Sequence, residues 1–318
     1  MKTFDKLYKD LQNADNSELN NIWQEAKKEH EKVKKIRLIT CLVISIMMII
    51  LICTTSTNNS FSMFFILPKI MLMVFANLFA YVIITILFSK QKNEYNKKYK
   101  ELIIPKLMSN FYNNLEYFPQ KGMPQYIYKE PKYEHYDLYD SEDYFEAQID
   151  NKYSIQMAEV KTQKEETYED SNGETKTRRV TIFHGLFAKI IMDKSIDSEL
   201  RITRNRGILS KNKLKMDSSK FEKHFDVEAS NKIIGMQILT ADIMEKLIEF
   251  REKTNMEFDV YIKYNEIYLR FHSGAMFEAG GLKKEAIDEE LLEKYFYMLN
   301  FTYNLSKKLI KTIEECQI

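Results

Sequence analysis

The chain has 318 residues, and its 47 lysines and arginines almost balance its 46 aspartates and glutamates, which leaves a net charge of +1. A chain without a strong positive field gives no electrostatic reason to expect nucleic acid as a partner. Eight glycines and five prolines exclude long flexible linkers, and three cysteines exclude a disulfide framework, which suits a reducing compartment.

Residues 1–35 are expected to form cytoplasmic helices, because Leu7 and Leu11, and then Leu19 and Trp23, follow helical spacing. Two placements fit this pattern. One is a helix on the membrane surface, and the other is a helix packed on the chain that leaves the second apolar block described below. The second placement is favoured, because the apolar stripe precedes the lysine-rich part and does not face it.

Two apolar blocks follow, 36–53 and 70–88, and neither has the polar face of a helix in a soluble core. The second has about the 20 residues that a transmembrane helix needs, and the stem of Arg37 extends the first toward that length. We predict two transmembrane helices joined by an extracytoplasmic loop, 54–69. Within the loop, Phe61–Leu67 is placed at the membrane interface and Pro68 near the first turn of the second helix, because a single helix from Phe61 would run about 42 Å.

Basic residues flank only the outer ends of these blocks, apart from Lys69 in the connection. They are Lys27, Lys28, Lys32, Lys34, Lys35 and Arg37 before the first block, and Lys90, Lys92, Lys97, Lys98 and Lys100 after the second. The positive-inside rule then places both termini in the cytoplasm. We therefore expect a multi-pass protein of the plasma membrane, with the lipid bilayer as its first partner.

Residues 89–118 are predicted as a helical stalk that Pro105 kinks or ends, followed by a cytoplasmic domain at 119–318. The expected strands are Tyr153–Gln163, Thr177–Phe183, Phe187–Met192, Glu199–Thr203 and a hairpin of Met256–Lys263 with Glu266–Phe271 that turns near Tyr264 and Asn265. Asn172-Gly173 lies between the first two and is a hairpin signal. The expected helices are Ser218–His224, Ala241–Lys253 capped by Thr240, and a long helix from about Asp288 to the C-terminus. The pattern predicts an α+β domain of antiparallel hairpins with flanking helices.

Signals for catalysis and metal binding are absent from the sequence. There is no G-x-S-x-G turn and no glycine-rich phosphate loop, and the five histidines are scattered. Segment 129–174 has fourteen acidic and five basic residues, but Asp137–Asp150 lacks the glycine and spacing of a calcium loop. We predict no catalytic residue, no cofactor and no metal. An enzyme without a recognisable motif would need a pocket near Gly185, His272 or Glu278.

Between Lys176 and Lys232 the charge balance reverses, with fourteen basic and seven acidic residues. The densest part is a candidate surface for an anionic partner and consists of Arg201, Arg204, Arg206, Lys211, Lys213 and Lys215. Such a partner could be anionic lipid headgroups, another protein, RNA or the chain's own acidic segment. The absence of stacking aromatic residues from Arg201–Lys215 disfavours nucleic acid. A solvated or internally paired face is the leading alternative.

Several segments of the chain resemble an uncharacterised family of bacterial membrane proteins known as domain of unknown function 3137. They are Thr181–Phe187, Phe221–Ser230, Ile238–Thr240 and Met276–Glu278. The resemblance implies two membrane helices before the domain, and no known activity, cofactor or catalytic residue. Asn231 and Ala241 depart from the aspartate and proline of the family pattern. In physical terms the segments indicate a set of structural residues: Phe183, Gly185, Phe187, Phe221, Phe225, Phe277 and Glu278.

Together these observations favour a membrane-anchored binding or scaffold protein that faces the cytoplasm. Two alternatives remain open. One is an enzyme without a recognisable motif. The other is a subunit of an oligomeric membrane complex or transporter, in which Asn77 of the second apolar block bonds to another helix, so a homo-oligomer is an open expectation.

Overall fold

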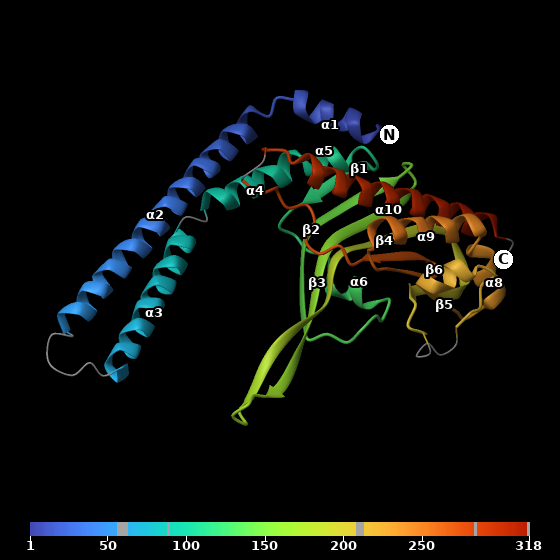
Figure 1. Ribbon diagram of the computed structural model, residues 1–318. Coiled ribbons are helices and arrows are strands. Elements are labelled where there is room, and N and C mark those ends of the chain that lie inside the picture. The colour runs from blue at the N-terminus through green and yellow to red at the C-terminus, as the bar shows by residue number, and fades with distance from the viewer. Residues whose placement is uncertain (56–62, 88–89, 208–212, 283–284, 317–318) are drawn as a thin grey trace. The chain divides into compact units, whose positions relative to one another are not determined.

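The computed structural model describes residues 1–55, 63–87, 90–207, 213–282 and 285–316. The chain divides into two compact units, which are described separately (Figure 1). The hairpin unit consists of Gln12–Leu102 and Ala279–Asp288. The sheet unit consists of Met1–Leu11, Ile103–Glu278 and Glu289–Ile318.

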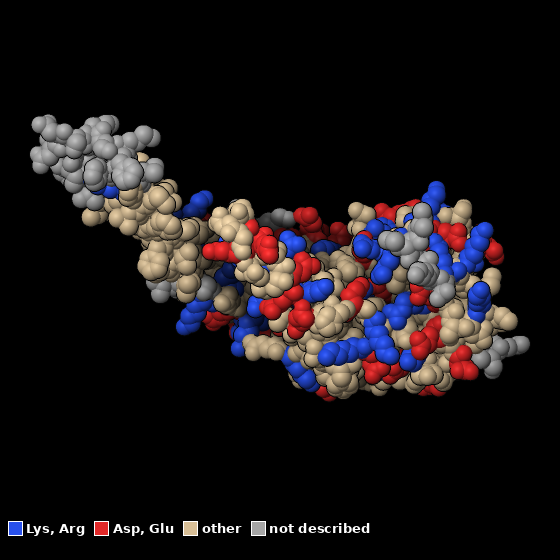
Figure 2. Space-filling view, turned by 90° about the horizontal axis from the view of Figure 1, so that it is seen from below, with Lys and Arg blue, Asp and Glu red and all other residues tan. Residues whose placement is uncertain are grey.

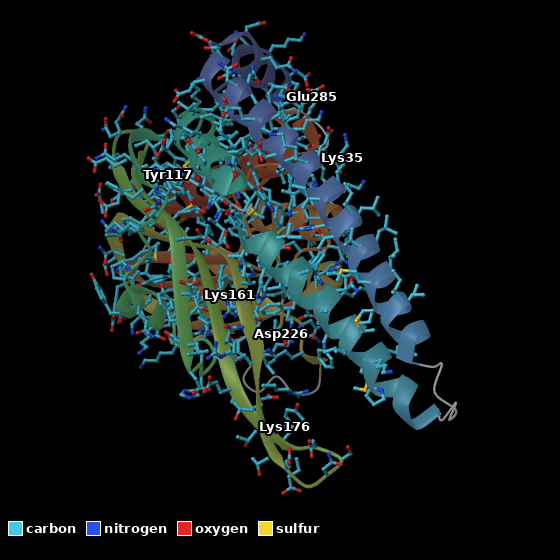
Figure 3. All side chains as sticks on the ribbon, turned by 90° about the vertical axis from the view of Figure 1, so that its left-hand side faces the viewer. Lys35, Tyr117, Lys161, Lys176, Asp226 and Glu285 are labelled. Carbon is cyan, nitrogen blue, oxygen red and sulfur yellow. The ribbon has the colours of Figure 1, made fainter. Side chains whose placement is uncertain are left out.

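The hairpin unit is built on two long helices that lie side by side (Figures 1 and 3), α2 (Ser17–Thr55) and α3 (Met63–Leu87). No glycine or proline interrupts α2, so helical propensity is maintained throughout. Arg37 Nη2 donates a hydrogen bond to Thr85 Oγ1 at 2.6 Å, and its guanidinium lies 4.4 Å from the Tyr81 ring centre. These contacts hold the middle of α2, where its polar half meets its apolar half, beside the end of α3.

The start of α3 corrects one prediction. Met63–Leu67 belongs to the helix, so a separate interfacial segment there was wrong, and Pro68 lies inside α3 rather than near its first turn. Phe61 lies outside the described residues. Within the described part of the chain, one helical stretch, Pro68–Met108, is long and apolar enough to cross a membrane, and its apolar window is not buried. Asn77 donates to the Met73 carbonyl of its own helix at 2.9 Å.

Helix α4 (Lys90–Leu102) completes the hairpin unit, and its aromatic side is buried. Tyr95 and Tyr99 are both 0% exposed, and the Tyr95 hydroxyl donates to the Ala286 carbonyl at 2.7 Å. The predicted break at Pro105 is confirmed, because α4 ends at Leu102 and a short helix, α5 (Ile104–Met108), begins with Pro105 in its first turn. The predicted helical stalk to residue 118 was wrong beyond this point, since Asn113–Phe118 is a strand.

The sheet unit contains six antiparallel strands in the order β1-β2-β3-β4-β5, with β6 also paired to β4. Their bounds are β1 Asn113–Phe118, β2 Leu138–Ile149, β3 Tyr153–Glu169, β4 Thr175–Arg204, β5 Phe225–Ala229 and β6 Phe258–Phe271. Strand β4 pairs with β3 along its first half, with β6 along its second half, and with β5 at its end. It is therefore the common strand of the sheet.

The strands are longer than their hydrophobic patterns indicate. The three strands predicted between Thr177 and Thr203 are one continuous strand, β4, and the hairpin predicted near Tyr264 is also one strand, β6. Tyr264 has φ of 53° and lies where the pairing of β6 with β4 shifts register. A local irregularity therefore replaces the expected turn.

The predicted hairpin at Asn172-Gly173 is confirmed, and its two strands project beyond the sheet as a ribbon (Figures 1 and 3). Asp170 Oδ1 accepts from the backbone N–H groups of Asn172 and Glu174, and Gly173 has φ of +78°, which favours glycine. The polar residues on both sides of the turn belong to the paired strands and not to a loop. Glu166 is opposite Arg178 in the strand register, and the two side chains bind at 3.0 Å.

Helices cover one face of this sheet (Figure 1). They include α9 (Ala241–Thr254) and α10 (Glu289–Glu315), and the predicted Thr240 cap is confirmed by its bond from Ile243 N. The Phe250 and Phe301 rings stack at 3.8 Å and join α9 to α10, and Phe301 contacts Phe271 of β6. Besides α5, the unit contains most of α1 (Phe4–Asn13) and the short helices α6 (Gln125–Lys129), α7 (Ser219–His224) and α8 (Lys232–Ile238).

The opposite face of the sheet is covered by α6 and the chain that follows it. Tyr128 of α6 packs on Phe183 and Phe187 of β4, with ring centres 5.9 and 5.0 Å away. The buried cluster on this face consists of Met123, Ile127, Tyr128, Tyr144, Ala158, Val160, Phe183, Phe187, Tyr261 and Tyr268. An α+β fold with a long C-terminal helix is therefore confirmed.

Candidate functional site

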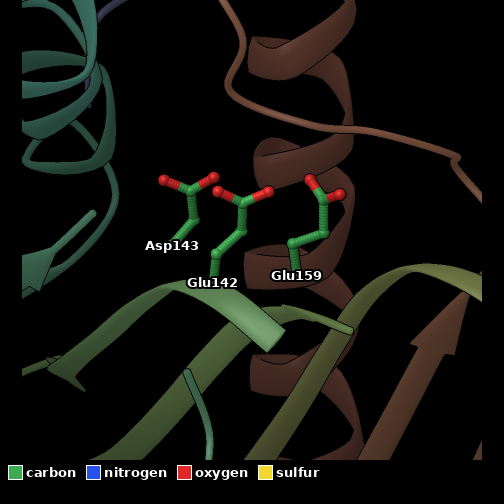
Figure 4. A group of neighbouring side chains, drawn as sticks. All are labelled: Glu142, Asp143 and Glu159. Carbon is green, nitrogen blue, oxygen red and sulfur yellow. The ribbon is translucent and has the colours of Figure 1, made fainter. Parts of the chain in front are cut away.

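Three carboxylates meet where β2 and β3 pair, and we call Glu142, Asp143 and Glu159 the carboxylate cluster. Their oxygens lie within 4.8 Å of one another, with α10 behind them in the view of Figure 4. Glu142 is opposite Glu159 in the strand register, so their side chains share one face. Asp143 has φ of 56° at a register shift, and this bulge turns its side chain toward the other two.

The two buried carboxylates of the cluster already accept hydrogen bonds from protein groups. Glu159 Oε1 lies 2.7 Å from His184 Nε2, and its Oε2 accepts from the Met276 backbone N–H at 2.6 Å. Asp143 Oδ1 accepts from the Tyr117 hydroxyl at 2.5 Å. Burial raises the pKa of the Glu159 carboxyl, although Met276 and His184 oppose this shift. Burial and the nearby Asp143 charge raise the pKa of Tyr117.

Carboxylate oxygens at this spacing are the donors that Ca²⁺ and Mg²⁺ prefer. The neighbouring donors nevertheless account for the grouping, since Tyr117, His184 and the Met276 N–H bind the buried oxygens directly. This cluster could not be predicted from the sequence, because only the pairing of β3 with β2 brings Glu159 beside Glu142 and Asp143.

A second polar centre surrounds Arg270 on the face of the sheet covered by α6. The Arg270 side chain is 3% exposed and binds two carboxylates. Its Nε and Nη2 contact Asp259 Oδ2 at 2.7 and 2.6 Å, while Nη1 and Nη2 donate to Glu134 at 2.6 and 3.1 Å. The guanidinium lies 3.8 Å from the Tyr133 ring centre. Burial is thus compensated by charge pairing and stacking.

Each charged group in this centre shifts the pKa of its partner in the direction that favours the charged form. Burial would raise the pKa of both Glu134 and Asp259. Arg270 holds the pKa of Glu134 below normal, and His272, whose Nε2 lies 3.8 Å from Asp259, acts together with Arg270 to hold the pKa of Asp259 below normal. These two carboxylates in turn raise the pKa of Arg270 despite its burial. All three groups are therefore charged at neutral pH. The sequence signal for this centre is an arginine within the apolar run Ile267–Phe271, and no prediction was based on it.

The predicted basic surface does not form one group in the structure. Arg201 donates to the Pro131 carbonyl at 2.7 Å, and Arg204 binds Glu257 at 2.9 and 3.0 Å. Arg206 lies 4.0 Å from Glu134, Lys213 binds the buried Asp226 at 2.5 Å, and Lys215 is exposed. Lys211 lies outside the described residues. Basic and acidic side chains are interspersed over the face shown in Figure 2.

The predicted structural residues lie at different places in the sheet unit, and all of them are buried except Glu278, which is half-buried. Phe183, Phe187, Phe221 and Phe277 are all 0% exposed. Phe221 of α7 stacks on Phe225 of β5 at 5.0 Å, so this ring pair joins a helix to the strand that follows it. An ideal Cβ at Gly185 would lie 2.0 Å from the Phe271 carbonyl oxygen. The Glu278 carbonyl accepts from Tyr295 at 3.1 Å.

A cavity of about 650 Å³ lies along α9 and α10, with Phe250 and Phe301 among its lining residues. Its basic residues are already paired, because Lys307 binds Asp150 and Lys308 binds Asp242, both at 2.7 Å. The cavity therefore does not combine free charged groups around one point.

Comparison with known proteins identifies the segment that contains most of these features. Residues 181–311 match the family described as protein of unknown function (DUF3137). This part of the chain belongs to that family. The DUF3137 segment includes His184, Asp259 and Arg270, whereas the carboxylate cluster and Glu134 precede it. No curated protein and no solved structure matches the chain.

The two departures from the DUF3137 pattern noted in the sequence have simple structural roles. Asn231 is the N-cap of α8, and its side chain accepts from the Ile233 and Ile234 N–H groups, as an aspartate would. Ala241 is the first residue of α9, where a proline is also well accommodated. Both positions therefore begin helices.

Proposed function

We propose that α2 and α3 cross a membrane as an antiparallel hairpin and attach the sheet unit to it as a binding or scaffold domain. The supporting observation is the exposed apolar surface of both helices. Leu38 and Met47 of α2 are 66% and 65% exposed, and Phe79 and Ile86 of α3 are 69% and 67% exposed. Burial of such a side chain contributes about 2 kcal/mol, so a surface of this kind is stable when lipid covers it.

The length and polar end of the hairpin support the same proposal. From Arg37 to Thr55, α2 rises by about 28 Å, close to the hydrocarbon thickness of about 30 Å. The contacts of Arg37 with Tyr81 and Thr85 lie at one end of this span. Arginine and tyrosine are favoured where lipid headgroups begin, because each has an apolar body and a polar tip.

The proposed orientation places both termini in the cytoplasm. The lysine-rich N-terminal part of α2 and the lysine-rich helix α4 adjoin the same end of the hairpin, since Lys98 of α4 binds Glu18 of α2 at 2.9 Å. The positive-inside rule assigns such an end to the cytoplasm.

Membrane insertion is tested by carbonate washing of membranes that contain the full chain. Wild type should remain in the pellet. A double variant, Leu42→Lys with Phe79→Lys, should be lost from it, because a lysine in the apolar span costs about 3 kcal/mol at the helix centre. Tyr126→Lys is the matched control, because Tyr126 is 69% exposed in the sheet unit. Release of wild type by carbonate would contradict the proposal.

Orientation is tested with a membrane-impermeant maleimide on intact cells, in a chain whose three cysteines are replaced by serine. Asn58→Cys in the connection should react from outside. Lys176→Cys in the exposed ribbon should react only after the membrane is permeabilised. The reverse pattern would show the opposite orientation. A binding or scaffold role further requires that the detergent-solubilised wild type retains a protein or lipid, and retention of neither would contradict that role.

A further inference from the structure

The two carboxylates that bind Arg270 differ in how deeply they are buried. Asp259 lies on the same strand as Arg270 and has a side chain that is 7% exposed, so it is a fixed partner. Glu134 lies between α6 and β2, and its side chain is 40% exposed. Because Asp259 alone balances the charge of Arg270, the departure of Glu134 would leave no net charge buried in the core. Glu134 is therefore replaceable.

Arg270 is not among the residues that line the neighbouring cavity, but its partner Glu134 is. The cavity has a volume of about 300 Å³. It is lined by Tyr128, Lys129, Lys132, Tyr133, Glu134, His135 and Tyr136. Glu134 is the one acidic residue of this lining, against two lysines. The Tyr133 hydroxyl is buried and, within the described residues, has no hydrogen-bond partner. An unused donor and an excess of positive charge both favour an anion at this place.

The orientation of the arginine is also suited to an anion. Nη1 and Nη2 of Arg270 present two parallel donors to Glu134, and the Tyr133 ring lies against the guanidinium at 3.8 Å. Asp259 holds the remaining edge of the group. A planar fork fixed in this way matches the oxygen spacing of a carboxylate or phosphate group.

We propose that this cavity binds a small oxyanion, carried by a carboxylate or phosphate group, with Arg270 as its anchor and Glu134 as the internal carboxylate that the ligand replaces. Lys129 and Lys132 supply positive charge, and the Tyr133 hydroxyl supplies a further donor. The site belongs to the sheet unit alone, so its occupancy does not depend on the proposed membrane anchor.

The first test is calorimetric titration of the full chain in detergent with inorganic phosphate and, separately, with acetate. Glu134→Gln keeps the shape of the side chain but removes the competing charge, so it should bind at least one anion about tenfold more tightly than wild type. Glu130→Gln is the matched control, since Glu130 is not a lining residue of the cavity and the carboxylates that bind Arg270 are those of Glu134 and Asp259. Its affinity should equal that of wild type.

A second pair of variants tests the proposed donors. Lys132→Gln should weaken binding severalfold. The double variant Arg270→Gln with Asp259→Asn removes the buried pair without leaving a lone charge, and it should abolish binding while circular dichroism confirms that the fold is retained.

Nanodiscs with and without phosphatidic acid distinguish the source of the anion. Binding of the free ions identifies a soluble ligand, whereas a response to Glu134→Gln only with phosphatidic acid identifies a lipid headgroup. Equal affinity of wild type and Glu134→Gln in every arm would overturn the proposal, and so would an equal gain in Glu130→Gln or the absence of binding throughout.

Discussion

His184 Nε2 lies 2.7 Å from Glu159 Oε1, and this contact connects neighbouring strands beneath the chain that follows β6. The second oxygen of Glu159 accepts from the Met276 N–H, and the His184 carbonyl accepts from the Gly274 N–H at 3.1 Å. Glu159 therefore connects β3 to β4 and to the segment after β6. One buried carboxylate holds three parts of the sheet unit together.

This arrangement gives Glu159 a measurable effect on the pH dependence of stability. Its folded-state pKa is raised, so the folded state favours the protonated carboxyl. The corresponding stabilisation is complete below the unfolded pKa of about 4.3 and is lost as the pH rises through the folded pKa. Glu159→Gln stays neutral and should therefore unfold at a higher temperature than wild type at pH 8, by a few degrees.

At pH 4 this difference should shrink toward zero, because wild type is then largely protonated as well. Thermal unfolding of the detergent-solubilised chain at several pH values measures the effect. Glu169→Gln, an exposed residue of the ribbon, should show no such trend. A lower midpoint for Glu159→Gln at pH 8 would mean that its charge stabilises the fold.

Gly185 should tolerate no side chain, because β4 and the end of β6 approach closely there. A Cβ would lie 2.0 Å from the Phe271 carbonyl oxygen and 2.7 Å from the Ser273 nitrogen. Both are backbone atoms, so strands must separate. We expect Gly185→Ala to lower the free energy of unfolding by about 3 kcal/mol, measured by denaturant titration. Among the described residues, nothing beyond the chain neighbours of Gly281 lies within 4 Å of a Cβ placed there, so Gly281→Ala should change the free energy of unfolding little. Equal losses in the two variants would contradict the packing argument.

Lys213 and Lys215 lie two residues apart in the predicted basic surface, but they should contribute differently to the stability of the fold. Lys213 binds Asp226, whose side chain is 2% exposed, whereas Lys215 is exposed. Lys213→Met removes the cation beside a buried carboxylate and should cost about 2 kcal/mol of stability. Lys215→Met should change it by less than about 0.5 kcal/mol. Similar values for both would show that Asp226 does not need its lysine.

Asp259→Asn should destabilise the sheet unit strongly at neutral pH, because Arg270 then loses its buried counter-charge. The expected loss is about 3 kcal/mol, against almost none for the exposed Asp193→Asn. Since the folded pKa of Asp259 is lowered, its contribution is present above the unfolded pKa of about 3.9 and is lost as the pH falls through the folded value. The difference between wild type and Asp259→Asn should therefore narrow below about pH 4. If the difference in stability between wild type and Asp259→Asn did not change with pH, the loss would be due to packing and not to the charge of Asp259.

The elements that could be predicted from sequence are those with a local cause. The helix after Thr240 is set by its cap, the break near Pro105 by a missing N–H group, and the turn at Gly173 by a backbone conformation that favours glycine. The long C-terminal helix follows from a wide apolar stripe. The lengths of β4 and β6 could not be predicted from hydrophobic patterns. Polar residues such as Arg178 belong to a strand because their backbone pairs with a neighbouring strand.

The sequence by itself determined the two apolar blocks, the α+β pattern and the resemblance to DUF3137, because composition and periodicity are properties of neighbouring residues. Only the tertiary structure decided which polar groups meet. Glu159 reaches Glu142 through strand register, and Glu134 reaches Arg270 from a segment 136 residues earlier. The free-energy cost of burying a charge depends on which polar partners replace water around it. Distant parts of the chain supply those partners only after folding.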